Sequence, residues 1–173
     1  TRMKNLLEID DSIIRDISRE PKIKRKNAPR EVTHTITLVP PHYIETLWED
    51  VKHHVGKAVI RSRGRWTLDG LKEALIYDYQ SLWLAFDKDH KIDGIGTTEI
   101  IEYPGKKMLA VQFLGGDNFN DWVWDINQRF QDWAKENGCS GVEATARMGF
   151  WKWLEQDGYE RAYVIYEKRF VDG

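Results

Sequence analysis

Residues 106–146, KKMLAVQFLGGDNFNDWVWDINQRFQDWAKENGCSGVEATA, contain the strongest structural pattern in the chain. Both ends of this stretch have the composition of strands, and the part between them, 119–138, has the apolar spacing of a helix. Its apolar residues recur at steps of four, four and three: Trp122, Ile126, Phe130 and Trp133. Asn137-Gly138 is a typical C-terminal stop for a helix. The stretch therefore predicts two parallel strands joined by a long amphipathic helix.

The rest of the chain predicts antiparallel strands and shorter helices around this unit. The expected elements are, in order, strand 32–39, helix 43–55, helix 68–78, strands 81–86, 94–103 and 106–115, helix 119–138, strand 140–146, short helix 147–158 and strand 159–170. Gly56 is the expected stop of the first helix, and Thr67 the expected N-cap of the second. The order β-α-α-β-β-β-α-β-α-β indicates an α+β or mixed α/β domain with a twisted, mostly antiparallel central sheet and one parallel pair.

The N-terminal residues differ from this pattern. Residues 5–17 have the apolar spacing of a short helix, and residues 19–30 carry basic side chains between two prolines, which is typical of a solvated linker. We therefore divide the chain into an N-terminal arm, 1–31, and one domain, 32–173. Helix and linker together also suit an arm that docks the domain onto a protein partner, so residues 5–30 are the expected partner-binding segment.

Composition limits the classes of function. The formal net charge of −2 gives no overall attraction to nucleic acid or to a membrane surface. Cys139 is the single cysteine, so an intrachain disulfide is impossible, and the histidines lack the spacing of metal ligands. The chain also has no apolar run long enough to cross a membrane. We expect a cytoplasmic protein without a metal site.

The element order resembles the GNAT superfamily of N-acetyltransferases over roughly residues 32–170. The segments that carry the resemblance are SLWLAF (81–86), GIGTTEII (94–101), KMLAVQFLG (107–115), AKENGC (134–139), GVEATA (141–146) and GFWKWLEQDGYERA (149–162). The pair GR at 64–65, YPGKK at 103–107 and the run VEATARMGFWKWLEQDGY at 142–159 are most similar to the GNAT-like proteins of tailed bacteriophages.

The resemblance implies acetyl-CoA as cofactor, with its pantetheine arm between the fourth and fifth strands and its pyrophosphate on the turn that precedes the long helix. Carried over to this chain, the cofactor-binding residues are Gln112, Phe113, Leu114, Gly115, Gly116 and Asn118. Glycines and a helix N-terminus suit an anion, because backbone amides can approach it. Asp117 departs from the family pattern, and its charge would compete with a diphosphate. The alternative is a plain strand-to-helix turn with Asp117, Asn118 or Asn120 as N-cap.

The resemblance also implies a glutamate base on a central strand and a tyrosine acid near the last helix. Glu143 and Glu99 lie on expected strands and are the candidate bases. For Glu143, the alternative is a charge that faces solvent or pairs with a neighbouring strand. The short last helix has no tyrosine, so Tyr159, directly after it, is the candidate acid.

Two functions follow from these residues. The first is an acyl-CoA-dependent N-acetyltransferase that transfers acetyl to an unknown amine by direct attack. The second is an inactive GNAT-fold phage protein that acts in virion assembly or host interaction, in the host cytoplasm or the virion. It would act through the basic arm and through tryptophans exposed on the surface. Trp124 is the candidate for such exposure, because it lies about 200° around the helix from Trp122.

Overall fold

The structure is a computed structural model that describes residues 32–146 and 148–171. Of these, 32–145 form one compact unit, and the residues from 146 onward form a second one. The predicted helix 5–17 and the basic run 19–30 lie outside the described residues. No helix within the described ranges is long and apolar enough to cross a membrane.

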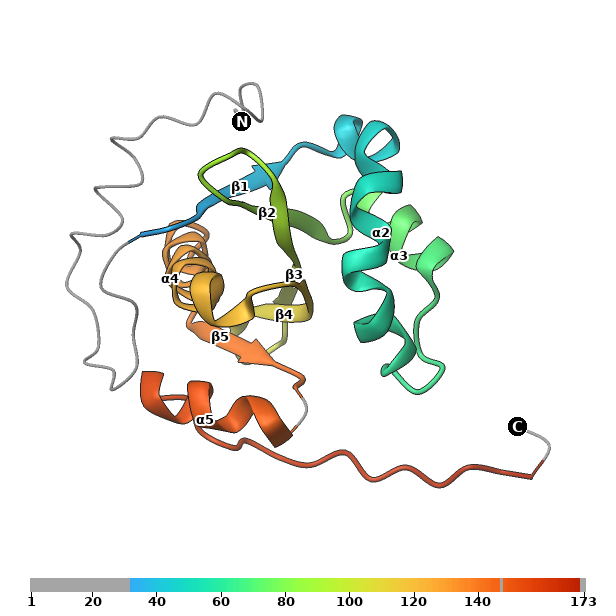
Figure 1. Ribbon diagram of the computed structural model, residues 1–173. Coiled ribbons are helices and arrows are strands. Elements are labelled where there is room, and N and C mark those ends of the chain that lie inside the picture. The colour runs from blue at the N-terminus through green and yellow to red at the C-terminus, as the bar shows by residue number, and fades with distance from the viewer. Residues whose placement is uncertain (1–31, 147, 172–173) are drawn as a thin grey trace. The chain divides into compact units, whose positions relative to one another are not determined.

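A five-stranded sheet forms the centre of the first unit (Figure 1). The strands stand in chain order: β1 (Thr35–Val39), β2 (Ser81–Phe86), β3 (Ile92–Glu102), β4 (Lys107–Gly116) and β5 (Gly141–Ala144). The first four pair antiparallel, and β5 pairs parallel to β4. The mixed α+β fold with one parallel pair, predicted from the sequence, is confirmed.

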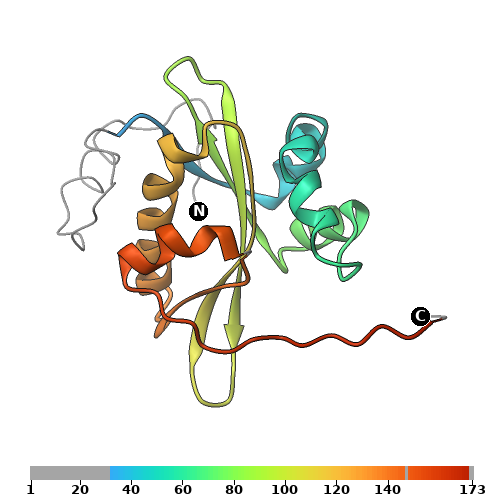
Figure 2. The same cartoon turned by 60° about the horizontal axis from the view of Figure 1, so that its bottom comes forward.

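Helices cover both faces of the sheet (Figure 2). A 3-10 turn (Pro41–Tyr43) leads into α2 (Ile44–Ile60), and α3 (Leu68–Ile76) follows it on the same face. The long helix α4 (Phe119–Glu136) lies on the opposite face and crosses from β4 to β5. Thr67 caps α3 as predicted, with its hydroxyl accepting from the Gly70 N–H at 3.0 Å.

The sequence reading of Gly56 was wrong, because α2 continues through it to Ile60. A glycine inside a helix costs about 1 kcal/mol relative to alanine. Beyond Gly56 the helix still presents an apolar residue to the sheet, since Val59 is buried. Burial of one such side chain stabilises by roughly 1.5–3 kcal/mol, which exceeds the cost of the glycine. Gly138, in contrast, has φ +73 and ends α4 as predicted.

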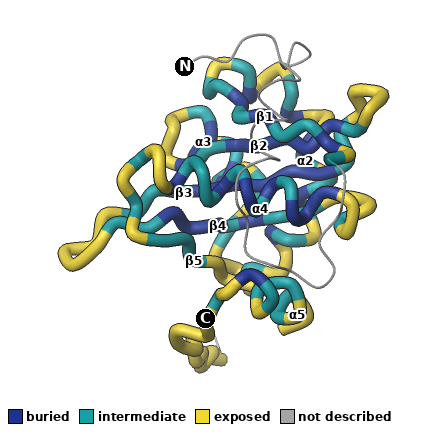
Figure 3. Tube along the Cα trace, turned by 90° about the vertical axis from the view of Figure 1, so that its left-hand side faces the viewer, coloured by how far each residue is buried: buried dark blue, intermediate teal, exposed yellow. Residues whose placement is uncertain are grey.

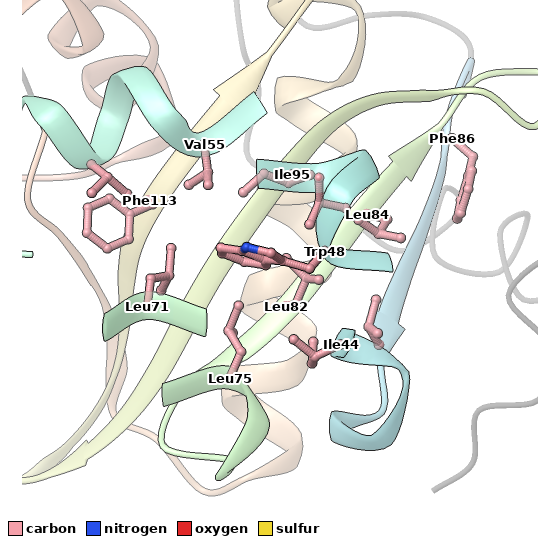
Figure 4. Close-up of a cluster of buried hydrophobic side chains, with 13 residues drawn as sticks. Ile44, Trp48, Val55, Leu71, Leu75, Leu82, Leu84, Phe86, Ile95 and Phe113 are labelled. Atoms are coloured by element: carbon pink, nitrogen blue, oxygen red, sulfur yellow. The ribbon is translucent and has the colours of Figure 1, made fainter. Parts of the chain in front are cut away.

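The sheet separates two hydrophobic cores. The core on the α2 and α3 face contains Trp48 and Phe113, and Figure 4 shows part of this cluster (Ile44, Trp48, Val55, Leu71, Leu75, Leu82, Leu84, Phe86, Ile95 and Phe113). The core under α4 is built around Trp83, whose ring meets Phe130 edge to face. The Trp83 Nε1–H donates to Thr98 Oγ1 at 2.9 Å, so this indole is fully buried without an unsatisfied donor.

The predicted exposure of Trp124 was wrong, because only 4% of its surface is accessible. Trp124 lies off the Trp122–Phe130 stripe, and so do Val123 and Gln128, which are buried as well. Helix α4 is therefore buried over a wider arc than a single stripe. Trp124 therefore cannot form the exposed partner-binding surface that the sequence suggested.

The second unit begins with a short helical segment. A 3-10 turn (Met148–Phe150), α5 (Trp151–Leu154) and a further 3-10 turn (Glu155–Asp157) follow one another and end at Gly158, which has φ +82. The predicted strand 159–170 is not a strand in the structure, and residues 160–171 are exposed (Figure 3). The pattern of these residues suits a strand, but a strand also requires a partner for its backbone groups, and sequence alone does not supply one.

We expect Leu84→Ala to lower the free energy of unfolding by about 2–5 kcal/mol, because Leu84 is fully buried and truncation leaves a cavity. Ile60→Ala is the matched control, since Ile60 is 79% exposed and its loss should cost less than about 0.5 kcal/mol. Urea unfolding followed by tryptophan fluorescence measures both. Equal losses in the two variants would contradict the described packing.

Candidate functional site

Strand β4 changes its partners at Gln112. Phe113 pairs with Thr97 and Val111 with Thr98, so Gln112 is an extra residue, a β-bulge, opposite β3. On the other side, β5 pairs only with residues 108–111 of β4. From Gln112 to Gly116, the edge of β4 that faces away from β3 therefore has no strand partner among the described residues. Alternate N–H and C=O groups of this segment point toward that open edge.

Two of the predicted catalytic residues are brought together next to this opening. Glu99 of β3 and Glu143 of β5 both pair with Ala110 of β4, one from each side. Residues that lie directly opposite on neighbouring strands point to the same face of the sheet. Two strand spacings put the Cα atoms of the glutamates about 10 Å apart. The side chain between them is that of Ala110, which is small and buried.

The glutamates lie on the same face of the sheet as α2 and α3. Ile95 belongs to the core on that face, and alternation along β3 places Thr97 and Glu99 on it too. Glu99 and Glu143 are both half-buried. We call Glu99, Ala110 and Glu143 the glutamate row. Its two carboxylate side chains are thus neither in the closed core nor fully in solvent, as expected for groups that meet a substrate at a sheet surface.

Each glutamate has a side-chain partner among the described residues. Tyr103 Oη donates to Glu143 Oε2 at 2.9 Å, and Gln112 Nε2 lies 3.4 Å from Glu99 Oε1. Sequence reasoning gave Tyr103 no chemical role, because it was only the last residue of the expected strand 94–103. The contact follows from the strand register, which brings Tyr103, directly after β3, close to Glu143 of β5.

The two glycines that follow are required by packing. Gly115 and Gly116 pair with Ile95 and Gly94 of β3, so both belong to β4. A Cβ on Gly115 would lie 1.9 Å from the backbone oxygen of His54 in α2. Gly116 has φ +141, and a Cβ there would meet Asp93 O at 2.2 Å. Close approach of backbones accounts for these two glycines, and their contact with a phosphate stays a prediction.

Asp93 holds the turn between β4 and α4. Its backbone oxygen accepts from the Asp117 N–H at 2.7 Å, and its carboxylate contacts His34 Nε2 at 2.7 Å and the Asn118 amide at 3.5 Å. The Trp122 Nε1–H donates to Asp117 O at 2.7 Å. Asn118 is the N-cap residue, with φ 54 and no side-chain cap hydrogen bond. Its side chain reaches back to β3 instead.

The electrostatics of this turn are acidic. Asp93, Asp117 and Asp121 surround the start of α4, where they interact favourably with the helix dipole. No lysine or arginine occurs between Lys107 and Arg129 in the sequence. Burial holds the pKa of the nearby His54 below its usual value, and His53 lowers this pKa further, while Asp117 and Asp93 act in the opposite direction. His54 is therefore mostly neutral at pH 7 and adds little positive charge.

Comparison with solved structures identifies the architecture. A predicted acetyltransferase from Clostridium acetobutylicum, solved with acetyl-CoA, superimposes with a TM-score of 0.58 at 11% identity, over 81% of this chain and 98% of the other. The aminoglycoside N-acetyltransferase AAC(6')-Iy in complex with CoA gives 0.55 at 13% identity, over 83% and 99%. The chain has the GNAT fold.

Further matches show how far this likeness extends. An aminoglycoside acetyltransferase from an uncultured soil metagenomic sample, in complex with sisomicin, gives a TM-score of 0.54 at 15% identity, over 80% of this chain and 97% of the other. A transcriptional regulator from Bacillus halodurans C-125 matches equally well, at 0.55 and 15%, over 79% and 99%. No protein-family model matches the sequence, and no curated protein is similar to it. The GNAT fold is thus established, and activity has to be argued from the site.

The predicted site residues fall into three groups. Glu99 and Glu143 share one face, as described above. The predicted cofactor-binding residues follow the bulge along β4 and the turn (Gln112, Phe113, Leu114, Gly115, Gly116 and Asn118), and of these Phe113 is buried in the core. Tyr159 belongs to the second unit, where its N–H donates to Leu154 O at 3.0 Å. Its role as an acid stays a prediction.

Gly115→Ala is expected to destabilise the protein by about 1–3 kcal/mol, because the new methyl group meets the rigid backbone of α2. Gly105→Ala is the control, since nothing lies within 4 Å of a Cβ at that position, and its effect should stay within about 1 kcal/mol. Chemical unfolding of both variants checks this. If Gly115→Ala is as stable as Gly105→Ala, α2 does not contact β4 as described.

Proposed function

We propose that this chain is an acyl-CoA-dependent N-acetyltransferase of GNAT type that acetylates an amine. The open edge of β4 after Gln112 is the observation that carries the proposal. An extended amide-containing chain such as pantetheine can add to such an edge as a strand would, through hydrogen bonds to the free backbone groups. The bulge ends the β4–β5 pairing at Val111 and Ala144, so the edge becomes available beside the two glutamates.

The residues present fit the two parts of acetyl-CoA differently. The β4 backbone between Gln112 and Gly116 suits the pantetheine part, because its amide and carbonyl groups that point away from β3 have no strand partner within the described ranges. The pyrophosphate part would reach the start of α4, where helix amides attract an anion and the carboxylate of Asp117 opposes it. We therefore assign the cofactor contacts chiefly to the β4 edge, with weaker binding at the turn.

The glutamate row supplies the acid–base chemistry. Acetyl-CoA would contribute the thioester that the amine attacks. Glu99 or Glu143 accepts the proton that the incoming ammonium must lose before its nitrogen can attack. Tyr103, which already donates to Glu143, holds a second exchangeable proton beside the same site. A departing thiolate can take this proton, so Tyr103 joins Tyr159 as a candidate acid.

The acceptor class follows from the charge of the row. Two carboxylates on one face attract a cation, and glutamates whose Cα atoms are about 10 Å apart suit an acceptor with more than one ammonium group. One carboxylate would then bind the acceptor while the other takes the proton. The neighbour solved with sisomicin is an aminoglycoside acetyltransferase, which is a property of that protein and a guide to the first compounds to screen.

A second function has one observation in its favour. The three aspartates around the start of α4 already supply the negative charge that stabilises a helix N-terminus. A GNAT-fold protein that binds no anionic cofactor could have such an acidic turn. Such a protein would act through residues 5–30 on a protein partner, as the sequence suggested. Cofactor binding separates the two functions, because only the enzyme requires it.

Calorimetric titration of acetyl-CoA at low salt should show micromolar affinity, roughly −8 kcal/mol. Asp117→Asn should tighten binding about two- to fivefold, since it removes a negative charge next to the pyrophosphate. Asp69→Asn, which changes an exposed acid in the first turn of α3, should leave the affinity unchanged. Absence of binding up to millimolar concentration would overturn the proposed enzyme and favour the second function.

Glu99→Gln or Glu143→Gln should lower kcat/KM by about 10²–10⁴-fold, because glutamine cannot take the proton. The variant with the larger loss identifies the base. Glu102→Gln is the matched control, since Glu102 lies three residues from Glu99 and thus on the opposite face, 3.7 Å from Lys107 Nζ. Initial rates with an acceptor found by screening measure all three. Full activity in both Glu99→Gln and Glu143→Gln would refute the role of the row.

A further inference from the structure

Helix α2 crosses the sheet toward the open edge of β4. The helix begins shortly after β1, at one edge of the sheet, and reaches β4 where the backbone of His54 and Val55 packs against Gly115. It then continues to Ile60 (Figure 1). The last turn of α2 therefore lies beside the part of β4 that has no second strand partner within the described ranges.

One side of this part of α2 faces the turn between β4 and α4. His54 interacts electrostatically with Asp117 and Asp93, the two aspartates that are hydrogen-bonded to each other in that turn. Lys57 and Arg61 follow His54 at steps of three and four residues, so the three side chains lie on the same side of the helix. They span about 10 Å along the helix axis. Lys57 and Arg61 are exposed.

The opposite side of α2 faces α3. Lys72 Nζ of α3 lies 2.7 Å from Glu45 Oε1 of α2. Position 45 lies two and a half helical turns before His54 and therefore on the other side of the helix. Lys52, which is two turns after Glu45, shares the α3 side, and its Nζ lies 2.9 Å from Glu49 Oε1. Packing of α3 thus leaves the side with Lys57 and Arg61 accessible.

The charge of this segment is opposite to that of the turn. Residues 51–68 contain five lysines and arginines and no acidic residue, in a chain whose formal net charge is −2. Lys57 and Arg61 form no ion pair with another described residue. The start of α4, in contrast, is surrounded by aspartates. Positive charge beside the open edge of β4 therefore comes from α2.

We propose that Lys57 and Arg61 bind the phosphate groups of acetyl-CoA and supply the positive charge that the turn into α4 lacks. This inference rests on the proposed function. A cofactor bound along β4 from Gln112 to Gly116 extends toward that turn, and the side of α2 with Lys57 and Arg61 faces it. The arginine fork can bind two phosphate oxygens at once, and the lysine acts as a point charge. Both oppose the repulsion from Asp117.

Calorimetric titration of acetyl-CoA into the full chain at low salt tests the two residues. Lys57→Gln and Arg61→Gln should each weaken binding about three- to tenfold, because each removes a charge-assisted hydrogen bond to phosphate. Lys52→Gln is the matched control: it removes the same charge from the α3 side of the same helix and should change the affinity less than about twofold. The losses should nearly vanish at about 0.5 M salt. Thermal unfolding checks that all three variants stay folded.

Truncated cofactors show which group is bound. S-acetylpantetheine has no phosphate, so Lys57→Gln and Arg61→Gln should bind it as tightly as the unchanged chain does. Acetyl-dephospho-CoA lacks only the ribose phosphate. Losses as large as those for acetyl-CoA would assign the contact to the diphosphate, and smaller losses would assign it to the ribose phosphate.

The outcomes separate this inference from the enzyme itself. If acetyl-CoA binds Lys57→Gln and Arg61→Gln as tightly as it binds Lys52→Gln, the phosphate site on α2 is wrong and the proposed enzyme stands. Equal losses for S-acetylpantetheine and acetyl-CoA would also overturn the phosphate site. If the unchanged chain does not bind acetyl-CoA at all, the enzyme and this inference both fail.

Discussion

Pairing along β4 is the constraint on which the rest of the structure depends. This strand pairs with β3 over its whole length and with β5 over only its first half. One extra residue, Gln112, marks the point where the second partner is lost. The backbone beyond it must find other partners or remain open. On one face this backbone is locked by α2, which allows only glycine at position 115. The open edge, the glutamate row beside it and the turn into α4 all follow from this arrangement.

The proposed site combines a rigid support with an unfavourable charge. Glu99, Ala110 and Glu143 lie on three adjacent strands, so their spacing is set by the sheet and changes little with loop motion. The turn, in contrast, is held by the carboxylate and the backbone of Asp93, which brings negative charge to the start of α4. Affinity for an anionic cofactor then depends mainly on backbone hydrogen bonds along β4. This accounts for a family-like architecture with a turn that departs from the family sequence.

Sequence reasoning succeeded where one residue pattern determines one structure. The Trp122–Phe130 stripe predicted α4 and, with it, the parallel pair of β4 and β5. Sequence reasoning failed where a contact with a distant part of the chain decides the local structure. Gly56 did not end α2, because burial of Val59 outweighs the cost of a glycine. Residues 159–170 have strand propensity without a described partner. The register that aligns Glu99 with Glu143, and the contact of Tyr103, depend on pairing across three strands, which no local pattern encodes.

Hydrogen exchange along β4 tests the central claim most directly, because it reads the open edge itself. Amides at 108–111 lie between two strands and should exchange slowly with or without acetyl-CoA. We expect peptides covering 112–118 to exchange faster in the free protein and to become protected when acetyl-CoA is added, while Asp69 and its neighbours in α3 stay unchanged. Equal protection of 108–111 and 112–118 in the free protein, or no change on addition of acetyl-CoA, would contradict the account.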